Sequence, residues 1–160
     1  MDKIEGIVNI TKKPVVERRA VATGVVNLST DSKQAIENRR VRKGDVIEAS
    51  TIAAIQAVKD TPRIIPHCHP IPLEGCEVSW GWENLALRCT VEVVANYKTG
   101  IEMEAITGVV GGLLCVLDMV KYLEKDENGQ YQNTSITELK ILEKYKSNCC
   151  LLYTSDAADE

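Results

Sequence analysis

Both histidines of this 160-residue chain lie in one proline-rich segment, residues 63–72, with the sequence Arg-Ile-Ile-Pro-His-Cys-His-Pro-Ile-Pro. Each proline fixes φ and removes a backbone donor, and the residue before it avoids the helical region, so we expect an extended segment. Alternate side chains of an extended chain share a face. The pattern therefore predicts His67 and His69 on one side and Cys68 on the other.

The same segment could bind either a metal or an anion. His-x-His supplies two zinc ligands, and Cys68 and Cys76 are nearby, but no further ligand follows at a regular spacing and no Cys-x-x-Cys is present. We expect no metal here and favour hydrogen bonding or phosphate contact, since histidines among lysines suit anions. A zinc-dependent hydrolase built on His67 and His69 is the alternative.

Three charged residues share one side of an apolar helix predicted for residues 100–123. Asp118 and Lys121 are three positions apart and therefore neighbours, and Glu104 lies fourteen positions earlier, at nearly the same angle. Small residues lie between them on this side. The pattern predicts a ligand cleft with a floor of small residues, and an exposed ion pair between Asp118 and Lys121 is the alternative.

Further cations lie near the start of predicted elements. Lys43 precedes Gly44 and Asp45 at the start of a predicted helix, where an ammonium group and free backbone amides could bind an anion together. A solvated turn lysine is the alternative. Arg18 and Arg19 are adjacent in a predicted strand, which places one of them on the core side, where it needs an anionic partner.

The composition indicates one globular domain. Hydrophobic residues make up 44% of the chain, enough for one core, and the formal net charge is −4. Residues 150–160 lack periodicity and resemble the translation of a sequencing adapter, so we expect the native domain to span residues 1–149. Three of the four net negative charges lie in this tail. A nearly neutral domain has no global field for nucleic acid or anionic membranes.

The chain is expected to be cytoplasmic. Its N-terminus lacks the apolar stretch of a secretory signal, and its six cysteines follow no disulfide framework. The apolar run of residues 105–117 contains glycines and is shorter than the roughly 20 residues that cross a bilayer. We therefore expect reduced thiols and no membrane partner.

The order of predicted elements indicates an α+β fold. Hydrophobic periodicity predicts strands at 15–28, 74–82, 85–95 and 136–144, a short helix at 29–40, and longer helices at 45–60 and 100–123. Gly24 is a possible bulge. Leaving the short helix aside, this βαββαβ order is ferredoxin-like, with an antiparallel four-stranded sheet and helices on one face. Helix 100–123 is apolar around most of its surface, so we expect the sheet and another subunit to cover it.

Four motifs resemble a known family. They are residues 43–46 (Lys-Gly-Asp-Val), 65–70 (Ile-Pro-His-Cys-His-Pro), 100–105 (Gly-Ile-Glu-Met-Glu-Ala) and 117–121 (Leu-Asp-Met-Val-Lys). In this order and spacing, from residue 8 to residue 144, the chain resembles the cyclic pyranopterin monophosphate synthases, the molybdenum cofactor biosynthesis protein C family. The resemblance implies a ferredoxin-like homohexamer, a trimer of dimers, with sites between subunits.

The resemblance also implies an activity and a set of site residues. The substrate would be 3′,8-cyclo-7,8-dihydroguanosine 5′-triphosphate, which a lyase without a cofactor rearranges to cyclic pyranopterin monophosphate with release of pyrophosphate. By motif position, Asp118 would be the general acid or base, Lys121 its partner, and Lys43 a contact of the triphosphate. The implied substrate-binding residues are His67, Cys68, His69, Met103, Glu104, Glu102 and Arg18.

Several points stay open from the sequence. His67 stands where many members of the family carry an apolar residue, so a backbone contact is expected there. A lysine beside Asp118 would lower its pKa and burial would raise it. Lys43 and Asp118 are expected to reach one pocket from different chains. A non-catalytic ferredoxin-like ligand-binding subunit is the alternative function.

Overall fold

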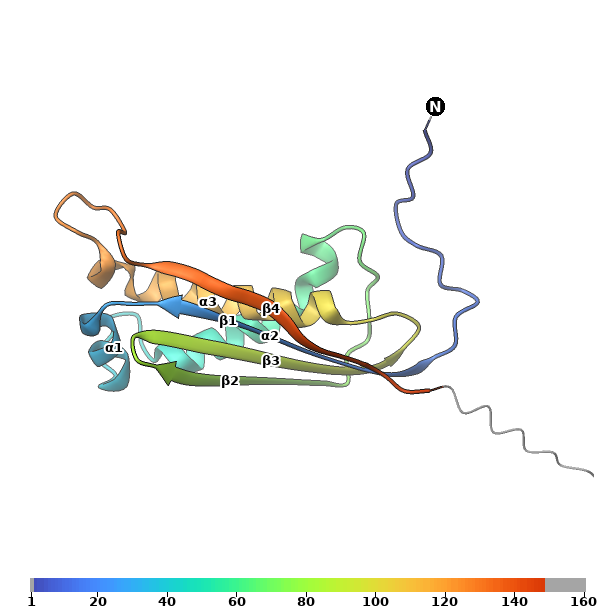
Figure 1. Cartoon of the computed structure of the whole chain (residues 1–160), viewed down its shortest axis with the longest axis horizontal. Coiled ribbons are helices and arrows are strands. Elements are labelled where there is room, and N and C mark those ends of the chain that lie inside the picture. Colours follow the sequence, from blue (N-terminus) through green and yellow to red (C-terminus); the bar gives the residue numbers. More distant parts are fainter. Residues whose placement is uncertain (1, 149–160) are drawn as a thin grey trace, which may run out of the picture.

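A computed structural model describes residues 2–148 and contains seven elements (Figure 1). The strands are β1 (Val16–Asn27), β2 (Gly75–Glu83), β3 (Ala86–Tyr97) and β4 (Ser135–Lys146), and the helices are α1 (Thr30–Glu37), α2 (Val46–Ile64) and α3 (Glu102–Glu124). The predicted element order is confirmed. The tail at 150–160 lies outside the described residues.

The four strands form one antiparallel sheet in the order β2-β3-β1-β4. Helix α3 packs on β1, β3 and β4, while α2 packs on α3 and reaches β2. The core between helices and sheet is made of alternate strand residues, such as Ala20, Ala22, Cys89 and Val91, which are fully buried. The ferredoxin-like α+β prediction is confirmed.

Glycines allow α2 and α3 to approach closely. A Cβ added at Gly108 would lie 2.5 Å from Val58 Cγ2, and one at Gly111 would lie 2.5 Å from Ala57 Cβ and 3.3 Å from the Ala53 carbonyl. Both glycines therefore face α2. The expected close backbone approach is confirmed, but the predicted ligand cleft over these small residues is wrong, because α2 fills that space.

Helix α2 continues one turn past its predicted end at residue 60. Its start matches the prediction, since the Asp45 side chain accepts a hydrogen bond from the Glu48 amide. Pro62 lies inside the last turn and has no amide for the Val58 carbonyl. The Thr61 hydroxyl donates to that carbonyl instead, at 3.0 Å, which lets the helix reach Ile64.

Irregular pairing near Gly24 belongs to the edge strand rather than to β1. The register between β1 and β4 shifts between Thr23 and Val25, and Glu138 of β4 has a φ of 53°. The extra residue is therefore in β4, whereas β1 pairs regularly with β3. A Cβ at Gly24 would lie 3.0 Å from Leu113 and Val109, so this glycine lets α3 pack on the sheet.

Helix α3 is the core helix of the domain. Among the described residues it is the one helix long and apolar enough to cross a membrane. Its 23 residues make it longer than the apolar run at 105–117. Its contacts with α2 and three strands are those of a core helix. Leu114 on α3 and Leu142 on β4 stay 52% and 53% exposed, so part of this apolar surface is uncovered in one chain.

Candidate functional site

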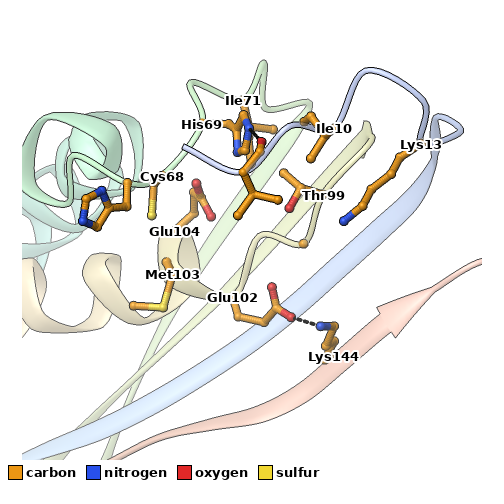
Figure 2. A pocket seen from close by; sticks show the side chains of 13 residues that line it. Ile10, Lys13, Cys68, His69, Ile71, Thr99, Glu102, Met103, Glu104 and Lys144 are labelled. Carbon is orange, nitrogen blue, oxygen red and sulfur yellow. Dashed lines mark hydrogen bonds and ion pairs between the residues drawn. The ribbon is translucent and has the colours of Figure 1, made fainter. Parts of the chain in front are cut away.

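A cavity of about 310 Å³ lies at the N-terminal end of α3 (Figure 2). Four segments contribute to it: the chain before β1, the residues after α2, the loop from β3 into the start of α3, and β4. Six of the seven predicted substrate-binding residues line it. The full lining consists of Val8, Ile10, Lys13, His67, Cys68, His69, Ile71, Thr99, Gly100, Glu102, Met103, Glu104 and Lys144.

The His-Cys-His motif reaches the cavity through a turn. Because α2 runs to Ile64, residues 65–68 reverse direction, and the Cys68 amide donates to the Ile65 carbonyl at 3.0 Å. The predicted extended conformation is wrong for this part of the segment. The predicted opposition of Cys68 to His67 and His69 is wrong as well, since all three line the same cavity.

Glu104 is a buried carboxyl group at the floor of the cavity. Glu104 is only 3% exposed. Burial, together with the negative charge of Glu102, raises the pKa of the Glu104 carboxyl group. Burial also raises the pKa of the Cys68 thiol, and Glu104 adds to that shift. Figure 2 shows the two groups pointing toward the same part of the cavity. A carboxyl group with a raised pKa is suited to donate a proton.

Glu102 lies in the same first turn of α3, two residues before Glu104, in a more polar environment. Burial disfavours its charge, but the hydrogen bond from Lys144 and the positive charge of Arg18 outweigh it, so its pKa is lowered. Lys144 Nζ lies 2.5 Å from Glu102 Oε1. Arg18 is 7% exposed and points its guanidinium toward the carbonyls of Tyr97 and Lys98, both 3.5 Å away. Arg18 lies beside the cavity rather than in its lining, where these carbonyls accept from two of its nitrogens and its charge favours the ionised form of Glu102.

The three predicted catalytic residues form a second, separate group. Lys43 Nζ lies 2.5 Å from Asp118 Oδ2, and Lys121 Nζ lies 2.8 Å from Asp118 Oδ1. Hydrogen bonds from Lys121 and Lys43 lower the pKa of Asp118 to about 2, and Asp118 raises the pKa of Lys121. All three side chains are about half exposed. The lysines thus outweigh burial at Asp118.

This ion cluster, Lys43 with Asp118 and Lys121, corrects one expectation. Lys43 and Asp118 come from the same chain, because the loop before α2 lies against the C-terminal half of α3 and Lys43 also bonds the Asp118 carbonyl at 3.3 Å. The expectation that they reach one pocket from different chains is wrong for this contact. Motifs 75 residues apart meet within one subunit.

The ion cluster and the cavity lie at opposite ends of α3. Fourteen residues separate Glu104 from Asp118, which is about 21 Å along a helix at 1.5 Å per residue. The predicted alignment of Glu104 with Asp118 and Lys121 on one side of the helix is consistent with helix geometry. The two ends of the helix are nevertheless too far apart to share one small ligand within one chain. No residue of the ion cluster lines the cavity.

Two lysines of the cavity were not identified from the sequence. Lys13 precedes β1 in a segment without regular structure, so its position depends on a path that no periodicity predicts. Lys144 lies on β4, whose register against β1 is shifted by bulges, and strand alternation alone does not place it. Within residues 2–148, no three histidine, cysteine, aspartate or glutamate residues are grouped so that they could hold a metal ion.

Comparisons with known proteins show the family to which this chain belongs. The MoaC family model matches residues 7–147. A probable cyclic pyranopterin monophosphate synthase of Thermococcus kodakarensis is 48% identical over 88% of this chain and 90% of its own length. A protein of the same description from Aeropyrum pernix is 48% identical over 88% of this chain and 97% of its own length. Another from Methanospirillum hungatei is 44% identical over 89% of this chain and 91% of its own length. The chain therefore belongs to the MoaC family.

Proposed function

We propose that this protein is a cyclic pyranopterin monophosphate synthase of molybdenum cofactor biosynthesis. It acts as a phosphorus-oxygen lyase on 3′,8-cyclo-7,8-dihydroguanosine 5′-triphosphate and releases pyrophosphate. The observation that carries the proposal is the ion cluster, in which two family motifs 75 residues apart in sequence meet at a carboxylate held between two ammonium groups. Relatives with the corresponding name cover nearly the whole chain.

The ion cluster supplies the charges that this reaction requires. With a pKa of about 2 in the free protein, Asp118 is ionised at neutral pH and is a weak base while both lysines bond it, and Lys121 and Lys43 are donors beside it. The ammonium groups also stabilise the negative charge that develops when a phosphate cyclises and pyrophosphate departs. Asp118 and Lys121 are therefore assigned the proton transfers, and Lys43 the triphosphate.

The cavity is assigned the purine-derived part of the substrate. Glu104, with its raised pKa, can protonate a ring nitrogen or a leaving nitrogen, while Glu102 stays ionised and accepts hydrogen bonds. His67, Cys68, His69 and Met103 complete the wall. Rearranging a purine ring needs several proton transfers, so two carboxyl groups with shifts in opposite directions suit it. No cofactor takes part in the proposed reaction.

The separation of the two groups supports a site shared between subunits. Because about 21 Å of helix separates Glu104 from Asp118, pairing the ion cluster of one chain with the cavity of another would bring both groups to one substrate molecule. The exposed Leu114, Leu139 and Leu142 supply apolar surface on α3 and β4 for such an assembly. We propose a homohexamer, a trimer of dimers, with sites at subunit boundaries.

A cytoplasmic location is also proposed. The four cysteines in the described part of the chain, Cys68, Cys76, Cys89 and Cys115, are free thiols, as expected in a reducing compartment. Burial raises the pKa of three of them, Cys68, Cys76 and Cys89, which makes them poor nucleophiles. Neither nucleic acid nor membrane is a proposed partner.

The direct test is turnover of the purified protein with the cyclic guanosine triphosphate derivative. We expect stoichiometric cyclic pyranopterin monophosphate and pyrophosphate, in a metal-free preparation, and at least about a hundredfold slower formation of both by Asp118→Asn. Saturable binding of the substrate without any product would contradict the enzyme assignment and support the non-catalytic ligand-binding subunit.

A further inference from the structure

The chain before β1 forms one wall of the cavity. Residues 7–13 adopt neither helix nor strand, yet Val8, Ile10 and Lys13 line the cavity and Ile10 is only 9% exposed. In Figure 2 this segment crosses the side of the cavity opposite α3, and Lys13 extends from it toward Thr99. The completeness of the cavity therefore depends on a segment without regular structure.

Few interactions hold this wall segment, residues 7–13, in place. His69 Nε2 lies 2.8 Å from the Val8 carbonyl, and Lys98 Nζ donates to the Thr11 carbonyl at 3.1 Å. The Lys13 amide donates to Ile10 within the segment. Because a carbonyl only accepts hydrogen bonds, His69 Nε2 must carry the proton and donate. That nitrogen is then occupied by protein backbone and is not free for the substrate.

Lys13 is the cation that this wall brings to the site. Among the described residues that line the cavity, Lys13 and Lys144 carry the ammonium groups, and Lys144 is paired with Glu102. Within residues 2–148, Lys13 forms no ion pair, so its charge is available to an anionic ligand. A lysine binds phosphate as a compact point charge.

We infer that His69 is a positioning residue, which fastens the wall segment through the Val8 carbonyl and thereby places Lys13 against the phosphate group nearest to the purine-derived part of the bound nucleotide, while Lys43 holds the far end of the triphosphate. This inference rests on the proposed function for the identity of the ligand. The hydrogen bond itself does not depend on it. Loss of this hydrogen bond is expected to shift the equilibrium between attached and detached forms of the wall segment about fivefold toward the detached forms, which is the effect of one net hydrogen bond.

The first test uses the full chain without substrate. Amide hydrogen exchange at Lys13 is expected to be about fivefold faster in His69→Ala, and close to wild type in His69→Gln, whose side-chain amide can donate to the same carbonyl. Unchanged exchange in His69→Ala would overturn the inference. Because no turnover is measured, this result stands even if the proposed reaction proves wrong.

The second test is a double-mutant cycle in the same assembly. His69→Ala and Lys13→Ala are each expected to raise KM about fivefold with kcat within twofold, and the double variant should be no worse than Lys13→Ala alone. Lys12→Ala, the exposed neighbour outside the cavity, is the matched control and should leave KM unchanged. Effects of His69 and Lys13 that multiply would show that His69 contacts the substrate directly and would overturn the inference. A wild-type chain without turnover would refute the proposed function instead.

Discussion

A site shared between subunits can be tested by mixing two inactive variants. Glu104→Gln damages the cavity, and Lys43→Ala damages the ion cluster. If each site takes its cavity from one chain and its ion cluster from another, a randomly mixed assembly contains some sites with both parts intact. Those sites have the cavity of a Lys43→Ala chain and the ion cluster of a Glu104→Gln chain. Neither homogeneous variant has any.

The expected activity follows from chain statistics. In an equimolar mixture, half of the cavities and half of the ion clusters are intact, so about a quarter of the sites combine both and the mixture recovers about a quarter of wild-type turnover. The chains are unfolded together, refolded, and separated by a tag carried on one variant to verify hybrids. Turnover is then measured per chain at saturating substrate.

The structure also supplies a mixture that must fail. Lys43 and Asp118 belong to the same ion cluster of one chain. Mixing Lys43→Ala with Asp118→Asn therefore leaves every cluster defective, and no activity should return. Rescue in this second mixture, or no rescue of Glu104→Gln by Lys43→Ala in verified hybrids, would refute the proposed division of the site.

Four further predictions follow from the site and the core. Asp118→Asn should lower kcat at least about a hundredfold with little change in KM. Because the pKa of Asp118 is about 2, this residue should produce no acid limb between pH 5 and 8 in the pH–rate profile, and an acid limb there that the substitution removes would contradict the assignment. Gly111→Leu should lower stability by about 2 kcal/mol or more in denaturant unfolding, since a Cβ already lies 2.5 Å from α2, whereas Gly81→Ala, with nothing within 4 Å, should change it little. Glu124 accepts hydrogen bonds from three hydroxyl groups, and its pKa is lowered. Its contribution to folding stability is therefore present above its ordinary pKa and is lost as pH falls through the folded value. Glu124→Gln should flatten the decline of Tm on acidification, and an unchanged dependence of Tm on pH would count against this role. Elemental analysis should find no stoichiometric transition metal, and one zinc per chain that survives a chelator would reverse this expectation.

Local signals predicted the fold well because each element has its own periodicity. The alternation in β3 places Leu87, Cys89 and Val91 in the core, and the Asp45 cap starts α2 as expected. The strands predicted at 74–82 and 85–95 leave residues 83–84 as the hairpin turn, and the structure has the turn one residue later, at 84–85, where Asn84 adopts the left-handed region with a φ of 56°. These features depend on neighbours in sequence, which the sequence displays directly.

The errors at the site concern which surfaces meet in three dimensions. Helical angles correctly aligned Glu104 with Asp118, but could not show that α2 covers the glycines between them. Proline chemistry suggested an extended 63–72 segment, whereas the Thr61 hydroxyl compensates for the missing amide of Pro62 and prolongs the helix. Both outcomes depend on partners that local rules do not specify.

The 23 residues of α3 set the spacing between the cavity and the ion cluster of one chain. Inserting one residue between Gly108 and Asp118 would turn the ion cluster by about 100° and advance it by about 1.5 Å relative to the cavity. The same insertion would move a glycine out of contact with α2. We therefore expect insertions and deletions to be tolerated outside this helix, for example in the loop at 125–134, and the length of α3 to be fixed by its packing and by the groups at its two ends.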